Sequence, residues 1–218
     1  MSANPLSFIS SISSTAVIGS ANVMELAVDT PFFLAIAKQD VHSFMMLGAM
    51  VDGKPQLLAR VGKVAMAPDE LACGPLGMIA QLLSFGVFAK LYDEGIKRHT
   101  KSERQISYQA YRIDIDTYIE VLSLLKSAHD YQLYYYQHGA GRQVPGEYEA
   151  LKKSGIKAFL PTAFSNDQST IILQYQNVAD WHPKSASNRA AFFQETTALS
   201  ISNTCRTSAK AIVEAALS

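Results

Sequence analysis

The stretch HSFMMLGAMVDGKPQLLARVGKV, residues 42–64, decides the fold, because two apolar runs flank Asp52-Gly53. Asp-Gly between apolar runs is the strongest short signal for a β-hairpin, since a type I′ turn needs positive φ at both central residues. We therefore expect antiparallel strands at 42–51 and 54–64. Pro55 lacks a backbone N–H, so the second strand should begin just after the turn or lie at an edge.

Further strands and helices are expected on both sides of the hairpin. The strand candidates are Val23–Val28, Phe32–Ala37, Arg104–Ile113, Tyr131–Tyr136, Lys157–Leu160 and Ser169–Gln176. The helix candidates are 70–97, a helix that Asp114 or Asp116 caps and that runs through Lys126, 146–153, 190–199, and a C-terminal helix. Early strands with interspersed helices predict an α+β fold, in which a small antiparallel sheet packs against helices.

The length of 218 residues suits one full domain, or one domain with an appended subdomain. We expect a Ser-rich segment over 1–20, followed by a single α+β domain over 21–218 with an insertion around 129–165.

The charge balance argues against nucleic acid as a partner, because 19 basic and 19 acidic residues give a formal net charge of zero. The N-terminus has no basic region, so no secretory signal peptide is recognised, and it is too polar to span a bilayer. The most apolar segment, 76–91, is interrupted by Gln81, Ser84 and Gly86, and is therefore expected to be a core helix with no integral membrane segment in the chain. We expect a soluble protein.

A cysteine opens the expected C-terminal helix, within Ser202-Asn203-Thr204-Cys205-Arg206-Thr207. Ser202 or Asn203 is a good N-cap, and the free N–H groups and helix dipole of a first turn favour a thiolate. Cys205 is thus a candidate nucleophile. The alternative is that Cys205 is a small buried apolar side chain, because cysteine is among the most buried residue types.

A nucleophilic cysteine needs a base, usually a histidine. His42 is the best placed of the five histidines, because it begins a strand and would lie at one end of a sheet; its alternative is a surface residue. His138 lies in a glycine-containing loop, and His99, His129 and His182 fit structural roles. The two cysteines do not have the spacing of a metal site or a disulfide framework, so we expect no metal and no cofactor.

The segments around His42 and Cys205 together resemble the circularly permuted papain-like superfamily. A histidine opens the early hairpin in His42-Ser43-Phe44-Met45-Met46-Leu47-Gly48, and Asn203-Thr204-Cys205 opens a late helix. The resemblance covers about 25 residues. It implies a small antiparallel sheet that carries the histidine, packed against the helix that carries the nucleophile.

The same resemblance implies a cysteine hydrolase (protease, amidase or isopeptidase) or an acyltransferase that works through a Cys205 acyl-enzyme. Its substrate would be a protein, a peptide or another acyl or amide compound. His42 would act as the base, and Asn203 and Thr204 would lie at the oxyanion or substrate-binding position. The chain also resembles bacterial secreted effectors, which implies the bacterial cytoplasm or delivery into a host cytosol.

The resemblance also implies a third catalytic residue, a polar side chain that orients the histidine from the strand after the histidine strand, and this chain has none at the expected position. Simple pairing across Asp52-Gly53 brings His42 beside Lys63, where no carboxylate, amide or imidazole lies. Gln109 on the expected strand 104–113 is our candidate, ahead of Asp40 and Gln39.

Two other functions compete with catalysis. A non-catalytic, effector-like interaction module with an inert cysteine would use the Tyr- and Phe-rich segments to bind a partner. A lipid or acyl-chain carrier would be lined by residues 76–91.

Overall fold

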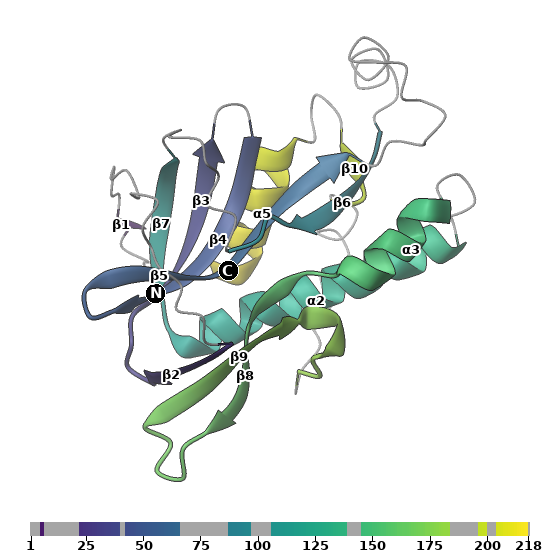
Figure 1. Cartoon of the computed structure of the whole chain (residues 1–218). Helices are drawn as coiled ribbons and strands as arrows, with labels where there is room; N and C mark the ends of the chain where they lie inside the picture. Colours follow the sequence, from purple (N-terminus) through teal and green to yellow (C-terminus); the bar gives the residue numbers. More distant parts are fainter. Residues whose placement is uncertain are drawn as a thin grey trace.

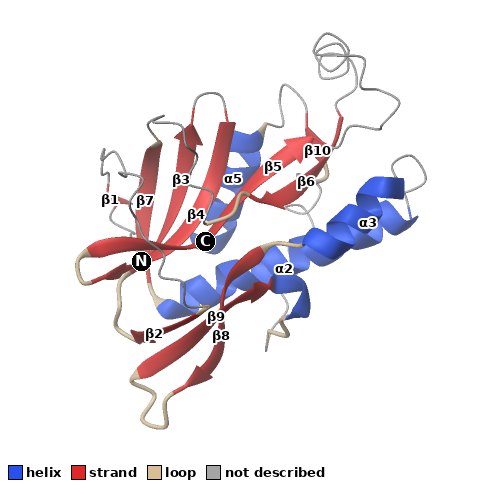
Figure 2. Cartoon of the chain, viewed as in Figure 1, coloured by secondary structure: helices blue, strands red, loops and turns tan. Residues whose placement is uncertain are grey.

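In the computed structural model, the described residues are 5–6, 22–39, 42–65, 87–96, 106–138, 145–183, 196–199 and 204–217. They form two antiparallel sheets and a few helices, which confirms a mixed, strand-rich α+β architecture (Figure 2).

The larger sheet has seven strands among these residues. Their spatial order is β1 (Pro5–Leu6), β7 (Ser107–Ile113), β3 (Phe32–Gln39), β4 (His42–Val51), β5 (Lys54–Ala65), β6 (Val87–Asp93) and β10 (Ala198–Leu199). The smaller sheet has the order β2 (Val23–Ala27), β9 (Thr170–Asn177) and β8 (Lys157–Phe164). The helices are α2 (Ile115–His138), α3 (Pro145–Ser154), the 3₁₀ helix η3 (Val178–Asp180) and α5 (Cys205–Leu217).

The central hairpin is β4–β5, and its turn is the expected one, with φ of 50° at Asp52 and 73° at Gly53. The strand register shifts beyond the turn, because Leu47 pairs with Ala59 while Gly48 pairs with Leu57. One extra residue in β5 makes a β-bulge, so every pair nearer His42 is displaced by one position. Simple pairing therefore misplaces the partner of His42.

Two helices cover the large sheet in different places. The C-terminal helix α5 packs on β3, β4 and β5 and crosses behind β4 in Figure 1. Helix α2 contacts α5, β3 and β8, and runs between the two sheets. A single cluster of buried apolar side chains includes members of both sheets and both helices, so one core holds the site's elements in place.

Three of the expected elements are wrong in whole or in part. Residues 87–93, expected in a helix, form β6, and Tyr131–Tyr136, expected as a strand, lies in the C-terminal half of α2. The aromatic run satisfies a helical period, because Gln132 and Tyr136 are buried four residues apart.

Ala198–Leu199 pair with β6 instead of ending the expected 190–199 helix. Three parts of the expected elements lie outside the described residues: most of the Ser-rich segment, residues 70–86 and 97 of the 70–97 helix, and residues 190–195.

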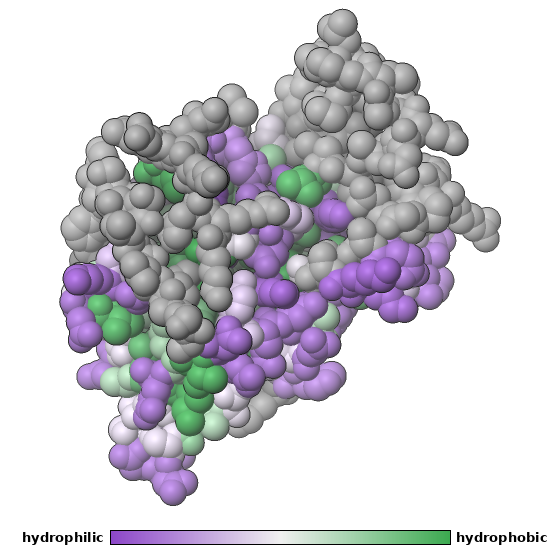
Figure 3. Space-filling view, in the orientation of Figure 1, coloured by the Kyte–Doolittle hydropathy of each residue, from purple (hydrophilic) through white to green (hydrophobic). Residues whose placement is uncertain are grey.

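The described helices include none that is both long and apolar enough to cross a membrane. On the face shown in Figure 3, the surface over α2 and α3 is largely hydrophilic. Apolar side chains gather near the small sheet, where Val23 and Phe164 are 52% and 47% exposed.

A buried tyrosine joins α2 to the small sheet, and its loss should destabilise the fold. The hydroxyl of Tyr118 donates a 2.5 Å hydrogen bond to the Phe159 carbonyl, and both side chains are buried. Tyr118→Phe leaves that carbonyl without the hydroxyl, so we expect the free energy of unfolding to fall by about 1–2 kcal/mol in denaturant titrations. Tyr134→Phe is the control, since Tyr134 is 63% exposed, and equal effects of both changes would contradict this account.

Candidate active site

Cys205 is the first residue of α5, as expected. Its cap is Thr204, whose Oγ1 accepts a 3.4 Å hydrogen bond from the Thr207 backbone N–H; Ser202 and Asn203 lie outside the described residues. The half-buried thiol donates a 3.1 Å hydrogen bond to the Lys63 carbonyl. Lys63 lies one residue past the last β5 residue that pairs with β4, so Cys205 sits where the β4–β5 ladder ends.

His42 begins β4, and its ring contacts a carboxylate that sequence reasoning did not propose. Nε2 of His42 lies 2.6 Å from Oε1 of Glu94, with side chains 31% and 15% exposed. Glu94 follows the last residue of β6, and its backbone N–H bonds to the Arg60 carbonyl at 3.0 Å. The sheet thus fixes both partners of this ion pair.

The protonation of the site follows from these contacts. The pKa of His42 is raised to about 9, first by its hydrogen bond with the Cys205 thiol and then by its hydrogen bond with Glu94. Burial raises the pKa of Cys205, but the hydrogen bond and charge of His42 and the charge of Lys63 outweigh it, so the net shift is downward. Both shifts favour a thiolate–imidazolium pair.

Gly62 makes room for the His42–Glu94 pair. A Cβ at this position would lie 2.9 Å from Nε2 of His42 and still closer to Oε1 of Glu94. Because real Cβ atoms do not approach other heavy atoms this closely, one of the two side chains would have to move.

Gly62→Ala should therefore separate Glu94 from His42 and slow any reaction at Cys205 about tenfold or more, with the fold retained. Alkylation kinetics and circular dichroism measure the two effects. Gly53→Asn is the control, since Gly53 adopts positive φ with nothing within 4 Å and asparagine tolerates that conformation. Full reactivity in Gly62→Ala would show that the contact is dispensable.

Gln109, the expected third residue, does not occupy the position beside His42. Gln109 on β7 pairs with Ile36 on β3, and Ile36 pairs with Met45 on β4. Met45 is three residues along β4 from His42, so the strand spacings put Gln109 about 14 Å from His42. Gln39 instead accepts a 3.4 Å hydrogen bond from Arg60, and Asp40 lies outside the described residues. Glu94 holds the place assigned to Gln109.

Glu94 was missed because residues 70–97 were interpreted as a helix. In the structure, Ala89 and Leu91 are buried while Lys90 and Tyr92 are not, which is the alternation of a strand. Glu94 follows the end of that strand. Among the described residues, no three metal-binding side chains gather into a site.

Comparisons with protein-family models, with curated proteins and with solved structures found no match.

Proposed function

We propose that the protein is a cysteine hydrolase or acyltransferase of permuted papain-like arrangement, with Cys205 as nucleophile, His42 as acid and base, and Glu94 as the residue that orients His42. The observation that carries the proposal is the convergence of three residues from distant parts of the chain. Cys205 opens a helix, His42 begins a strand with its Nε2 2.6 Å from Glu94, and the Cys205 thiol is the first cause of the raised pKa of His42.

The chemistry follows from the proton positions. Glu94 engages Nε2 of His42, which leaves Nδ1 to exchange a proton with Cys205. The Cys205 thiolate attacks a carbonyl carbon, a C–S bond forms, and the carbonyl π electrons move onto the oxygen. The backbone N–H of Cys205, in the first turn of α5, donates to that oxyanion.

Collapse of this intermediate breaks the bond to the leaving group, which takes the proton of the His42 imidazolium. The acyl group then remains on Cys205 as a thioester. In the second half-reaction, His42 removes a proton from water or from another nucleophile, and that nucleophile attacks the thioester and releases the thiolate. Water gives a hydrolase, and an acceptor alcohol or amine gives an acyltransferase.

Turnover of activated esters tests the proposal. The wild-type protein should hydrolyse 4-nitrophenyl butyrate, while Cys205→Ser and His42→Ala should each lose about 100-fold or more in kcat/KM. Cys73→Ser is the matched control and should keep wild-type activity. Equal turnover in wild type and Cys205→Ser would reject Cys205 as the nucleophile, and no turnover above the uncatalysed rate would favour the non-catalytic interaction module.

A further inference from the structure

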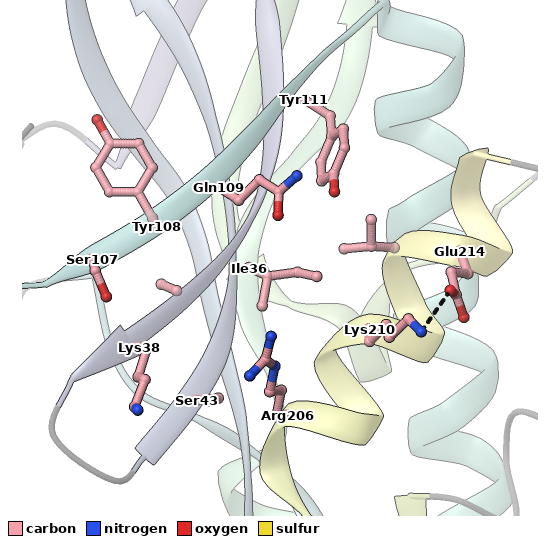
Figure 4. Close-up of a pocket in the computed structure, with 12 residues that line it drawn as sticks. Ile36, Lys38, Ser43, Ser107, Tyr108, Gln109, Tyr111, Arg206, Lys210 and Glu214 are labelled. Atoms are coloured by element: carbon pink, nitrogen blue, oxygen red, sulfur yellow. Dashed lines mark ion pairs between the residues drawn. The ribbon is translucent and has the colours of Figure 1, made fainter. Parts of the chain in front are cut away.

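A pocket lies on the side of the large sheet that α5 covers. Its cavity volume is about 410 Å³, and it lies between α5 and strands β3 and β7. Figure 4 shows the side chains around it. The residues that matter here are Ile36, Lys38, Ser43, Gln109, Arg206 and Lys210.

The pocket carries an excess of positive charge. Lys38, Arg206 and Lys210 line it with one carboxylate, Glu214, which lies 3.3 Å from Lys210. Among the described residues, neither Lys38 nor Arg206 has an ion-pair partner. Two cations are therefore left to meet a negative group from outside this part of the chain.

Part of the polar lining faces the middle of the pocket (Figure 4). In Figure 4 the Arg206 guanidinium points into the middle of the pocket, beside Ile36 and Ser43. The side chains of Gln109 and Tyr111 project from β7 into the same space. A planar guanidinium with a nearby amide and hydroxyls is a suitable donor set for a carboxylate or a phosphate.

The pocket is linked to the candidate dyad through α5. Arg206, which lines the pocket, directly follows Cys205, whereas Ser43 alternates to the face of β4 opposite that of His42. A group bound at Arg206 thus lies at the first turn of α5, beside the nucleophile. The positive end of the helix dipole adds to the attraction for an anion there.

From this placement we propose that the pocket binds an anionic group of the substrate, a carboxylate or a phosphate, while Cys205 attacks the substrate's carbonyl. This inference rests on the proposed function and deepens it, because it names acidic acyl or amide compounds as the substrate class. Arg206 is the main contact, Lys38 adds charge, and Gln109 donates through its amide.

A matched pair of esters tests the charge preference. The mono-4-nitrophenyl ester of glutaric acid carries a carboxylate that 4-nitrophenyl butyrate lacks. We expect Arg206→Gln to lower kcat/KM about tenfold for the glutarate ester and less than twofold for the butyrate ester, with Arg206→Lys partly restoring the preference. Arg112→Gln is the control, since Arg112 is exposed on β7 and alternates away from Gln109 and Tyr111.

A binding experiment tests this inference separately from the proposed function. Glutarate and inorganic phosphate are titrated by calorimetry into Cys205→Ala and, for comparison, into the double variant that carries both Cys205→Ala and Arg206→Gln. Saturable binding that depends on Arg206 supports the anion pocket, and the tighter of the two ligands identifies the group. Ester turnover with no charge preference and no anion binding overturns the pocket and leaves the proposed function intact. Anion binding without turnover by the wild-type protein overturns the proposed function instead.

Discussion

Replacement of His42 by alanine is expected to slow alkylation of Cys205 by iodoacetamide about 10- to 100-fold near pH 6.5. The wild-type pair favours the thiolate of Cys205, because the hydrogen bond and charge of His42 contribute to the lowering of its pKa. In His42→Ala the hydrogen bond and charge that lower the pKa of Cys205 are lost, so the effect of burial, which raises this pKa, is less opposed. A free thiol with a pKa of about 8.5 is only about 1% ionised near pH 6.5, which sets the size of the effect.

Peptide mass spectrometry follows the alkylation of Cys205 separately from that of Cys73. His138→Ala is the matched control, since His138 ends α2 and bonds through Nδ1 to the Tyr134 carbonyl, away from the candidate site. A His42→Ala rate within twofold of wild type would mean that the imidazole does not ionise Cys205.

Replacement of Glu94 by glutamine should lower kcat about tenfold or more and move the alkaline limb of the pH profile to lower pH. The carboxylate raises the pKa of His42 by bonding to its charged form, second only to Cys205 as a cause. The neutral amide removes that charge, so the pKa falls from about 9 towards its ordinary value of 6.5. Because Glu94 acts through His42, we expect KM to change much less than kcat.

The same shift predicts how stability depends on pH. A raised histidine pKa stabilises the fold fully below the unfolded pKa of about 6.5, and this contribution is lost as pH rises through about 9. The stability difference between wild type and Glu94→Gln should therefore be largest below pH 6.5 and should shrink above pH 9. Glu25→Gln, an exposed change on β2, is the control. If Glu94→Gln had an unchanged kcat and an unchanged alkaline limb of the pH profile, Glu94 would not be the residue that orients His42.

The hairpin and the C-terminal helix could be predicted from sequence because local chemistry determines them. Asp52-Gly53 supplies the positive φ values of the turn, and the apolar spacing of Ala209, Ile212 and Val213 defines the buried face of α5. These two predictions suffice to place His42 at the start of a strand and Cys205 at the start of a helix.

The register and the third residue depend on tertiary structure, so local patterns did not reveal them. The bulge at Leu47/Gly48 shifts the pairing by one residue, and no turn signal marks it. Residues 87–93 follow a long apolar run, so helix and strand were hard to separate there until pairing with β5 fixed the strand. Glu94 reaches His42 only after both features are in place.

The most direct test of the central claim is the mass of the intact protein after rapid mixing with 4-nitrophenyl butyrate and acid quenching. The account predicts a butyryl adduct that peptide mapping places on Cys205, that is absent from Cys205→Ser and that forms much more slowly in His42→Ala and Glu94→Gln. Turnover of the ester with no adduct on Cys205, or equal adduct formation in all three variants, would contradict the account.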